Sequence, residues 1–284
     1  MKYALLVGLG TCPRNIGMSL SGTDNDLSLV SSIMIRRFGF DTVSVLKDSA
    51  ATLDNVCREL KRIVSEAGPG DDVAFYFSGH GSVLPDLNND ESDSYDECLV
   101  LYDHHPDNAF TDDILAECLK GLHSEAYLTL IFDSCHSGGL IGSEDILSKL
   151  NEQNDRSAVL DNGDITAESF TSDNTRKVGK KQSPGGPSGQ RHILVSACTE
   201  GGVCFEFSNL NRRSPKKKFG LMTWLLVKQL RPRKNKSVRM DWQSIHKRLT
   251  VKILRKTEGV QVPLLYGRAD LMDRGPFGIF SDEG

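Results

Sequence analysis

The sequence lacks the features that would assign it to several common classes. No run of 18 or more apolar residues occurs among its 284 residues, so it contains no transmembrane helix signal. Basic residues show no excess, because 34 Lys and Arg stand against 38 Asp and Glu, a net charge of −4. A general nucleic-acid binder would normally show a basic surplus. We therefore expect neither a nucleic acid nor a membrane as partner.

Paired cysteine motifs are also missing. The seven cysteines include no C-x-x-C pair, so their spacing suits neither a disulfide framework nor a zinc ribbon. His104 and His105 match no zinc-ligand spacing. Residues 1–10 have too short an apolar core for a secretory signal and indicate a buried strand instead. We expect a globular, soluble protein in the reducing cytoplasm.

Short apolar runs alternate with amphipathic segments along most of the chain. The runs are rich in Val, Ile, Leu and Phe without strict alternation, which is typical of strands buried on both faces of a parallel sheet. The predicted strands are 3–9, 43–46, 73–77, 128–132 and 193–197, and the predicted helices are 26–38, 52–67, 114–122, 220–230 and 241–256. This order predicts an α/β fold with helices on both faces of a mostly parallel sheet.

One long segment breaks the alternation. Residues 142–190 are dominated by polar residues, Gly and Pro, and no helical or strand period continues through them. Structureless connections of this length inside a compact domain are uncommon and usually functional or disordered. We interpret 142–190 as a flexible polar linker between residues 1–141 and 191–284.

Two reactive side chains follow predicted strands directly. Ser78-Gly79-His80-Gly81 comes after one strand, and Asp133-Ser134-Cys135-His136-Ser137-Gly138-Gly139 comes after another. The carboxyl ends of parallel strands meet at one sheet edge, so His80 and Cys135 face each other if the strands are neighbours. Imidazole is the usual base that converts a thiol into a nucleophilic thiolate. We predict that Cys135 is a nucleophile and His80 its base, with the N–H groups of Gly81 and Cys135 stabilising an oxyanion.

These motifs resemble those of the metacaspases and bacterial orthocaspases, which carry S-G-H-G and D-x-C-H-S-G. Ser196-Ala197-Cys198, Phe205-Glu206-Phe207 and Gln261-Val262-Pro263 are weaker matches to the small region of that family. The resemblance implies a caspase-like three-layer α-β-α sandwich. Residues 1–141 would be its large catalytic region, and 191–284 the small region that completes the same domain. We expect a monomer.

The resemblance also implies a substrate pocket. Gly22-Thr23-Asp24-Asn25-Asp26 is similar to the G-C-x-N-D segment of the family, with Thr23 in place of its Cys. Carried over by position, Asp26, Asp133, Ser78 and Thr23 would line the pocket. Two carboxylates would attract Arg or Lys and repel an acidic side chain. Alternatively, Asp26 caps the helix at 26–38.

The sequence is therefore interpreted as that of a cysteine endopeptidase that cleaves after Arg or Lys in protein and peptide substrates. The alternative is a catalytically silent caspase-like scaffold that acts through protein contacts. No cofactor is required for the predicted Cys–His chemistry. Many metacaspases respond to calcium, and Asp112 and Asp113 resemble an acidic pair of that family. The same two residues also suit a helix N-terminus without any ion, with Thr111 as its cap.

The linker suggests a zymogen that processes itself. Its basic residues match the predicted pocket, and flexible polar loops are the segments that proteases reach. We predict autocatalytic cleavage in Arg176–Lys181, after Arg176, Lys177, Lys180 or Lys181, with Arg156 as the second choice. The alternative is a solvated loop whose lysines serve only solubility.

Overall fold

A computed structural model gives the fold. It describes residues 1–11, 19–85, 95–105, 107–135, 159–160, 191–199, 202–209, 217–231, 240–267 and 269–278. The central sheet contains six strands, which are β1 (Lys2–Gly8), β2 (Thr42–Lys47), β3 (Asp72–Ser78), β7 (Tyr127–Asp133), β9 (Arg191–Ser196) and β12 (Leu264–Gly267). The first five coincide with the predicted apolar runs to within two residues at each end.

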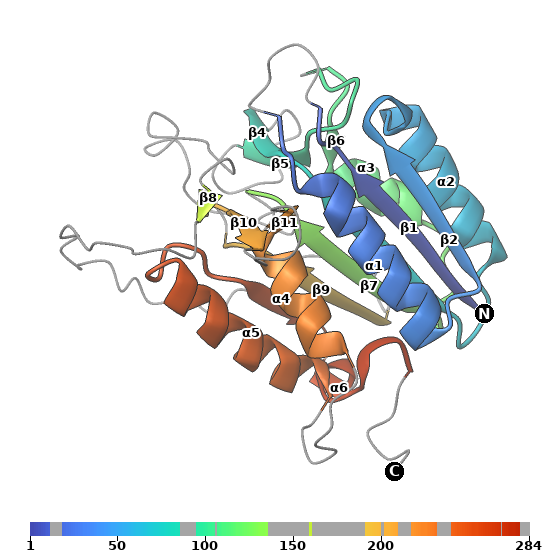
Figure 1. Cartoon of the computed structure of the whole chain (residues 1–284). Coiled ribbons are helices and arrows are strands. Elements are labelled where there is room, and N and C mark those ends of the chain that lie inside the picture. Colours follow the sequence, from blue (N-terminus) through green and yellow to red (C-terminus); the bar gives the residue numbers. More distant parts are fainter. Residues whose placement is uncertain are drawn as a thin grey trace.

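The strand order across this sheet is β12-β9-β7-β3-β1-β2 (Figure 1). β12 pairs antiparallel with β9, whereas the other four pairings are parallel. Parallel strands need crossover connections, and the chain supplies helices for them. The predicted mostly parallel sheet is confirmed.

Helices cover both faces of the sheet (Figure 1). They are α1 (Thr23–Phe38), α2 (Leu53–Glu66), α3 (Asp112–Leu119), α4 (Leu221–Leu230), α5 (Trp242–Lys256) and the short α6 (Ala269–Met272). One apolar core lies between the sheet and α1, α4 and α5, and a second lies between the sheet and α2 and α3. No helix in the described part of the chain is both long and apolar enough to cross a membrane. The layers are those of the predicted α-β-α sandwich.

Two small sheets lie beside the main one. β4 (Gly81–Pro85), β5 (Tyr95–Leu99) and β6 (Phe110–Thr111) form one antiparallel sheet that starts directly after His80. β8 (Val159–Leu160), β10 (Glu206–Asn209) and β11 (Lys217–Gly220) form the other. Within the predicted linker, only Val159–Leu160 is described, and it pairs with β10.

The helix ends follow local chemistry. α1 ends at Gly39, whose φ of 64° is a left-handed conformation that glycine adopts at little cost. The Thr111 side chain accepts a hydrogen bond from the Ile114 N–H and caps α3, as the sequence predicts. α1 begins at Thr23, three residues before the predicted start, so Asp26 lies inside the helix.

The C-terminal segment ties the two regions of the chain together. The Phe277 ring, 3% exposed, contacts the rings of Phe38 and Phe40, with centroids 5.0 and 5.1 Å away. Its carbonyl accepts a hydrogen bond of 2.7 Å from the Lys2 ammonium group. Phe277 also adopts a φ of 53°, which is costly for a bulky residue and persists only where the surroundings impose it. Its packing therefore joins residues 269–278 to β1 and α1.

We expect Phe277→Ala to lower the free energy of unfolding by about 3–5 kcal/mol, because truncating a buried Phe leaves a cavity as well as losing apolar contacts. Val260→Ala is the matched control, since Val260 is 55% exposed, and its effect should stay within about 0.5 kcal/mol. Urea unfolding followed by circular dichroism measures both. Equal midpoints for the two variants would show that the Phe277 contacts do not hold the regions together.

Candidate active site

The register of the sheet brings the two reactive motifs together. β3 and β7 are hydrogen-bonded neighbours, and Ser78 pairs with Asp133 at their carboxyl ends. His80 lies two residues after Ser78, and Cys135 lies two residues after Asp133. The two loops therefore leave the same sheet edge side by side, as the sequence predicts for neighbouring strands.

The two loops are in direct contact. A Cβ added to Gly81 would lie 1.9 Å from the Cys135 carbonyl oxygen, so only glycine fits at this position. The Gly79 N–H also donates to the Asp133 carbonyl at 3.4 Å, and the His80 carbonyl accepts from the Val100 N–H at 3.0 Å. The main chain around His80 is thus fixed against the Cys135 loop on one side and β5 on the other.

Cys135 is nearly buried and His80 is half-buried. The Cys135 sulfur accepts a hydrogen bond of 3.3 Å from the Cys204 backbone N–H, a neutral donor that favours a thiolate. The arrangement supplies a thiol and an imidazole on adjoining loops. These are the groups that nucleophilic attack on a carbonyl requires.

Asp26 is fully buried at the same sheet edge. Its carboxylate accepts a hydrogen bond of 3.0 Å from the Ser78 hydroxyl and contacts the Gly220 backbone N–H at 2.9 and 3.0 Å. The alternative that Asp26 caps α1 is wrong, because Gly22 occupies the cap position and Asp26 is the fourth residue of the helix. Asp26 therefore connects the end of β3 with the junction between β11 and α4.

Asp133 is also fully buried, and it binds the first turn of α4. One of its oxygens accepts from the Thr223 N–H at 3.0 Å and from the Thr223 hydroxyl at 2.6 Å. The first N–H groups of a helix have no partner within the helix, so Asp133 supplies one. The Thr223 hydroxyl lies 2.7 Å from the Tyr76 hydroxyl, which extends the polar network under the sheet edge.

Glu206 is a third buried carboxylate, which the sequence indicates only through a weak match to the family. It is 2% exposed and accepts a hydrogen bond of 2.7 Å from the Gly22 N–H. It stands two residues after Cys204, whose N–H contacts the Cys135 sulfur. Its place between Phe205 and Phe207 was the available signal, since a carboxylate in an apolar segment is costly to bury without a partner.

Thr23 lies beside this site, but its side chain bonds to a main-chain carbonyl. It is fully buried, and its hydroxyl donates to the Leu9 carbonyl at 3.3 Å. Ser78, Asp26 and Asp133 are joined through β3, β7 and the β11–α4 junction. The described contacts thus link three of the four predicted pocket residues. The fourth, Thr23, bonds to the Leu9 carbonyl instead.

The predicted calcium ligands lie elsewhere. Asp112 and Asp113 occupy the first turn of α3, where negative charge stabilises the helix N-terminus without any ion. No group of three or more His, Cys, Asp or Glu side chains is arranged to hold a metal ion among the residues described. Calcium binding by Asp112 and Asp113 stays a prediction, and calcium enters no step of the proposed reaction.

Several predicted residues lie outside the described part of the chain. They are His136, which follows Cys135, and the predicted cleavage positions Arg156, Arg176, Lys177, Lys180 and Lys181. The boundary at residue 141 also falls there.

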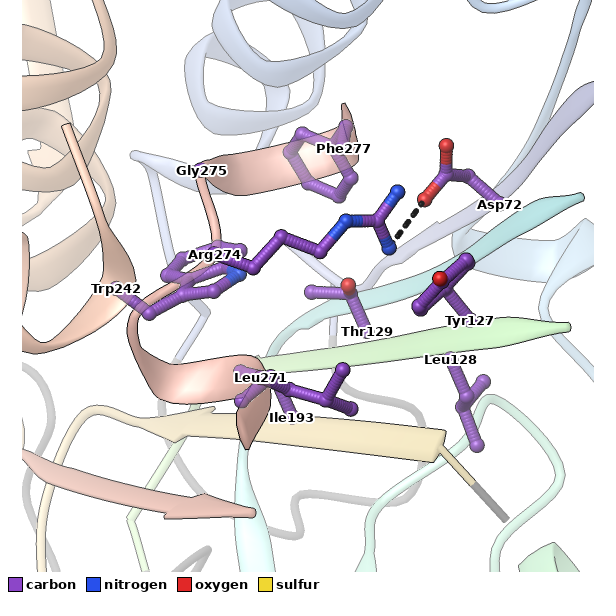
Figure 2. A pocket seen from close by; sticks show the side chains of 10 residues that line it. All are labelled: Asp72, Tyr127, Leu128, Thr129, Ile193, Trp242, Leu271, Arg274, Gly275 and Phe277. Atoms are coloured by element: carbon purple, nitrogen blue, oxygen red, sulfur yellow. Dashed lines mark ion pairs between the residues drawn. The ribbon is translucent and has the colours of Figure 1, made fainter. Parts of the chain in front are cut away.

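A small pocket opens at the opposite edge of the sheet (Figure 2). Arg274 lies over the Tyr127 ring, 3.4 Å from its centroid, and forms an ion pair of 3.6 Å with Asp72. Burial raises the pKa of Asp72 more than the Arg274 charge lowers it. Asp72 and Ser78 begin and end the same strand, so this pocket lies roughly 20 Å from Cys135. It plays no part in the site at the carboxyl edge.

The fold is shared with a solved caspase. The crystal structure of Caspase-1 from Spodoptera frugiperda superposes with a TM-score of 0.52 at 13% identity, covering 94% of this chain and 88% of that one. At this identity the likeness concerns the fold alone. The architecture is that of a caspase-like domain.

Sequence comparison is more specific. A family model, "Metacaspase, peptidase C14 domain", matches residues 2–143. Metacaspase-1 of Schizosaccharomyces pombe is 35% identical over 149 residues, which are 49% of this chain and 35% of that protein. Metacaspase-1B of Aspergillus fumigatus is 28% identical over 288 residues, covering 90% of this chain and 68% of that one. The chain belongs to the metacaspase family, and it spans about a third of the length of the first of these relatives.

Proposed function

We propose that this protein is a cysteine endopeptidase that cleaves peptide bonds after Arg or Lys. The observation that carries this proposal is the pairing of Ser78 with Asp133, because it brings the loops of His80 and Cys135 to one sheet edge. Membership of a peptidase family supports the reaction class. The buried carboxylates beside the two loops support the preference for a basic side chain.

The reaction follows from the Cys–His pair. His80 takes the proton of the Cys135 thiol, and the thiolate attacks the scissile carbonyl carbon. The N–H groups of Gly81 and Cys135 stabilise the resulting oxyanion. His80 then protonates the leaving amine as the C–N bond breaks, which leaves a thioester on Cys135. Water activated by His80 hydrolyses that thioester and restores the thiol.

Charge supports the substrate preference. Asp26, Asp133 and Glu206 are buried close to the reacting loops, and the hydrogen bonds given above come to them from neutral N–H and O–H groups. Carboxylates in a pocket favour a cationic side chain over an acidic one, because like charges repel. A guanidinium group matches two carboxylate oxygens in planar geometry. We infer that its N–H groups replace the backbone donor that Gly220 provides to Asp26.

Active-site labelling tests this function directly. A peptidyl acyloxymethyl ketone ending in Arg should alkylate Cys135 of the full chain and no other cysteine, as read by peptide mass spectrometry. The matched reagent ending in Asp should label at least about tenfold more slowly, since a charge reversal in the pocket costs more than the 1.4 kcal/mol of a tenfold change. Labelling of Cys135 at equal rates would contradict the basic pocket, and labelling of surface thiols alone would contradict the dyad.

We further propose that the protein cleaves itself after a basic residue between 142 and 190. β9 follows this segment and lies between β7 and β12 in the sheet. The Phe277 contacts add a second attachment between the two regions. The two fragments should therefore stay associated after cleavage.

Self-cleavage should appear in the wild type and not in Cys135→Ala. We expect new N-termini after Arg176, Lys177, Lys180 or Lys181, with Arg156 next, and co-elution of both fragments in gel filtration. Replacing those four residues by Gln should move cleavage to Arg156 or stop it, while peptide hydrolysis by the unprocessed chain reports whether processing is needed. A wild type that stays intact while hydrolysing peptides would show that processing is not part of its mechanism.

A further inference from the structure

Two further thiols, those of Cys198 and Cys204, lie beside the proposed nucleophile Cys135. Cys198 and Cys204 both donate to the Ser134 carbonyl, at 3.3 and 3.1 Å, and neither is exposed. The Cys204 thiol also interacts with that of Cys135. Together with the 3.3 Å contact from the Cys204 N–H to the Cys135 sulfur, this places Cys204 directly against the nucleophile. All three cysteines are free thiols.

The loop that carries Cys204 is held in place from both ends. The buried Gln261 side chain donates to the Ala197 carbonyl at 3.0 Å and accepts from the Phe205 N–H at 3.3 Å. The Gly202 N–H also donates to the Thr199 carbonyl at 2.8 Å. The position of Cys204 is thus built into the fold.

The two neighbouring thiols differ in reactivity. Cys204 is completely buried, and burial with the adjacent thiols of Cys135 and Cys198 raises its pKa well above the ordinary value. It therefore stays protonated and does not react with an oxidant by itself. Cys135 keeps 7% exposure on the edge that a substrate must reach. Oxidation by a small molecule begins at Cys135.

We propose that Cys204 is the resolving cysteine of Cys135, so that oxidation of the nucleophile by a peroxide ends in a Cys135–Cys204 disulfide. The Cys135 thiolate first attacks hydrogen peroxide, which gives a sulfenic acid and hydroxide. The Cys204 sulfur then attacks the Cys135 sulfur. The S–O bond breaks, the Cys204 proton leaves with the hydroxyl group as water, and the disulfide forms. A dithiol such as dithiothreitol supplies two electrons to restore both thiols.

The disulfide would keep Cys135 in an oxidised form that a reductant can restore to the thiol. It removes the thiolate, so hydrolysis stops, and it prevents further oxidation of Cys135 to sulfinic acid, which thiols do not reverse. The proposal rests on the proposed role of Cys135 as a reactive thiol. Cys198 also contacts Cys204, and its thiol donates to the Ser134 and Gly202 carbonyls. It therefore serves as the matched control.

The test treats the full chain with hydrogen peroxide and maps its cysteines by mass spectrometry without reduction. In the wild type and in Cys198→Ala we expect a cross-linked pair of peptides containing Cys135 and Cys204, two hydrogen atoms lighter than their sum. In Cys204→Ala we expect a Cys135 sulfenic acid that dimedone traps, and sulfinic acid at longer times. Cys204→Ser is the second variant should Cys204→Ala fold poorly.

Recovery of activity gives an independent reading. Each variant is compared with its own untreated activity after peroxide and then dithiothreitol. Wild type and Cys198→Ala should regain most of their untreated activity. Cys204→Ala should regain a share of its own untreated activity that is at least about fivefold smaller. A wild type that accumulates sulfenic or sulfinic acid without a cross-link, or one that links Cys135 to Cys198, would overturn the proposal. A cross-link in a chain that hydrolyses no peptide would overturn the proposed function and leave this inference standing.

Discussion

Cys135→Ala is expected to lower kcat for an Arg-containing peptide by a factor on the order of 10⁵–10⁶, and His80→Ala by nearly as much. The two side chains act as one unit, so losing either removes the same step, and the double variant should be no slower than either single one. Initial rates with a fluorogenic peptide measure the loss. The described loops contact each other through main-chain atoms, so both variants should keep the fold and melt within a few degrees of the wild type.

Two controls make this result specific. Cys57→Ala removes a half-buried thiol on α2, outside the site, and should keep its rate. His136→Ala removes the imidazole next to Cys135 in the sequence and should matter much less than His80→Ala. Substantial turnover by purified Cys135→Ala would indicate another nucleophile, and no turnover by the wild type would favour a catalytically silent scaffold. Loss of all activity in His136→Ala alone would reassign the base.

Asp133→Asn is expected to lower kcat/KM for Arg and Lys peptides by about 30-fold to 1,000-fold, which corresponds to about 2–4 kcal/mol. The change removes the negative charge but keeps an amide oxygen that can still accept from the Thr223 N–H and hydroxyl. The first turn of α4 therefore keeps its partner. The loss should fall on substrates with a basic side chain before the scissile bond.

Thr223→Val separates the two roles of Asp133. It removes the 2.6 Å hydroxyl contact while leaving the carboxylate charged, so it should lower the melting temperature more than it changes the preference for Arg. If Asp133 only supported α4, both variants would destabilise the protein and slow all peptides equally. Melting curves and kcat/KM for Arg and neutral peptides, measured on both variants, decide between these outcomes.

The sequence predicts the parts of this molecule that depend on local pattern. The apolar runs at 73–77 and 128–132 lie inside β3 and β7 because strands buried on both faces need continuous apolar side chains. The positions of His80 and Cys135 follow from those strands, since their loops leave the same edge. Neither segment alone indicates that β3 and β7 are neighbours. That pairing follows only from the strand order of the folded sheet.

Contacts between distant segments were not predictable. Glu206 meets Gly22 across 184 residues, and Gln261 meets Ala197 across 64, with no periodic pattern to mark either pair. The short strands β10, β11 and β12 have four residues each, too few for a strand signal. The sequence motifs thus indicated the candidate reacting groups, His80 and Cys135, while the contacts around them depend on tertiary packing.

Asp26 illustrates the same limit at one residue. The sequence allowed a pocket carboxylate or a helix cap, because Asp near a helix start is typical of caps. The earlier start of α1 removed the second option, and the contacts with Ser78 and Gly220 revealed a link between distant elements. The local sequence contained no information on Gly220.

The most direct test of the account is hydrolysis of a fluorogenic peptide panel that differs only in the residue before the scissile bond, with Arg, Lys, Gln and Asp at that position. The purified wild type and Cys135→Ala are assayed side by side. We expect cleavage of the Arg and Lys peptides, rates at least about a hundredfold lower for Gln and Asp, and no turnover by Cys135→Ala. Equal cleavage of Arg and Asp peptides, or turnover of any peptide by Cys135→Ala, would contradict it.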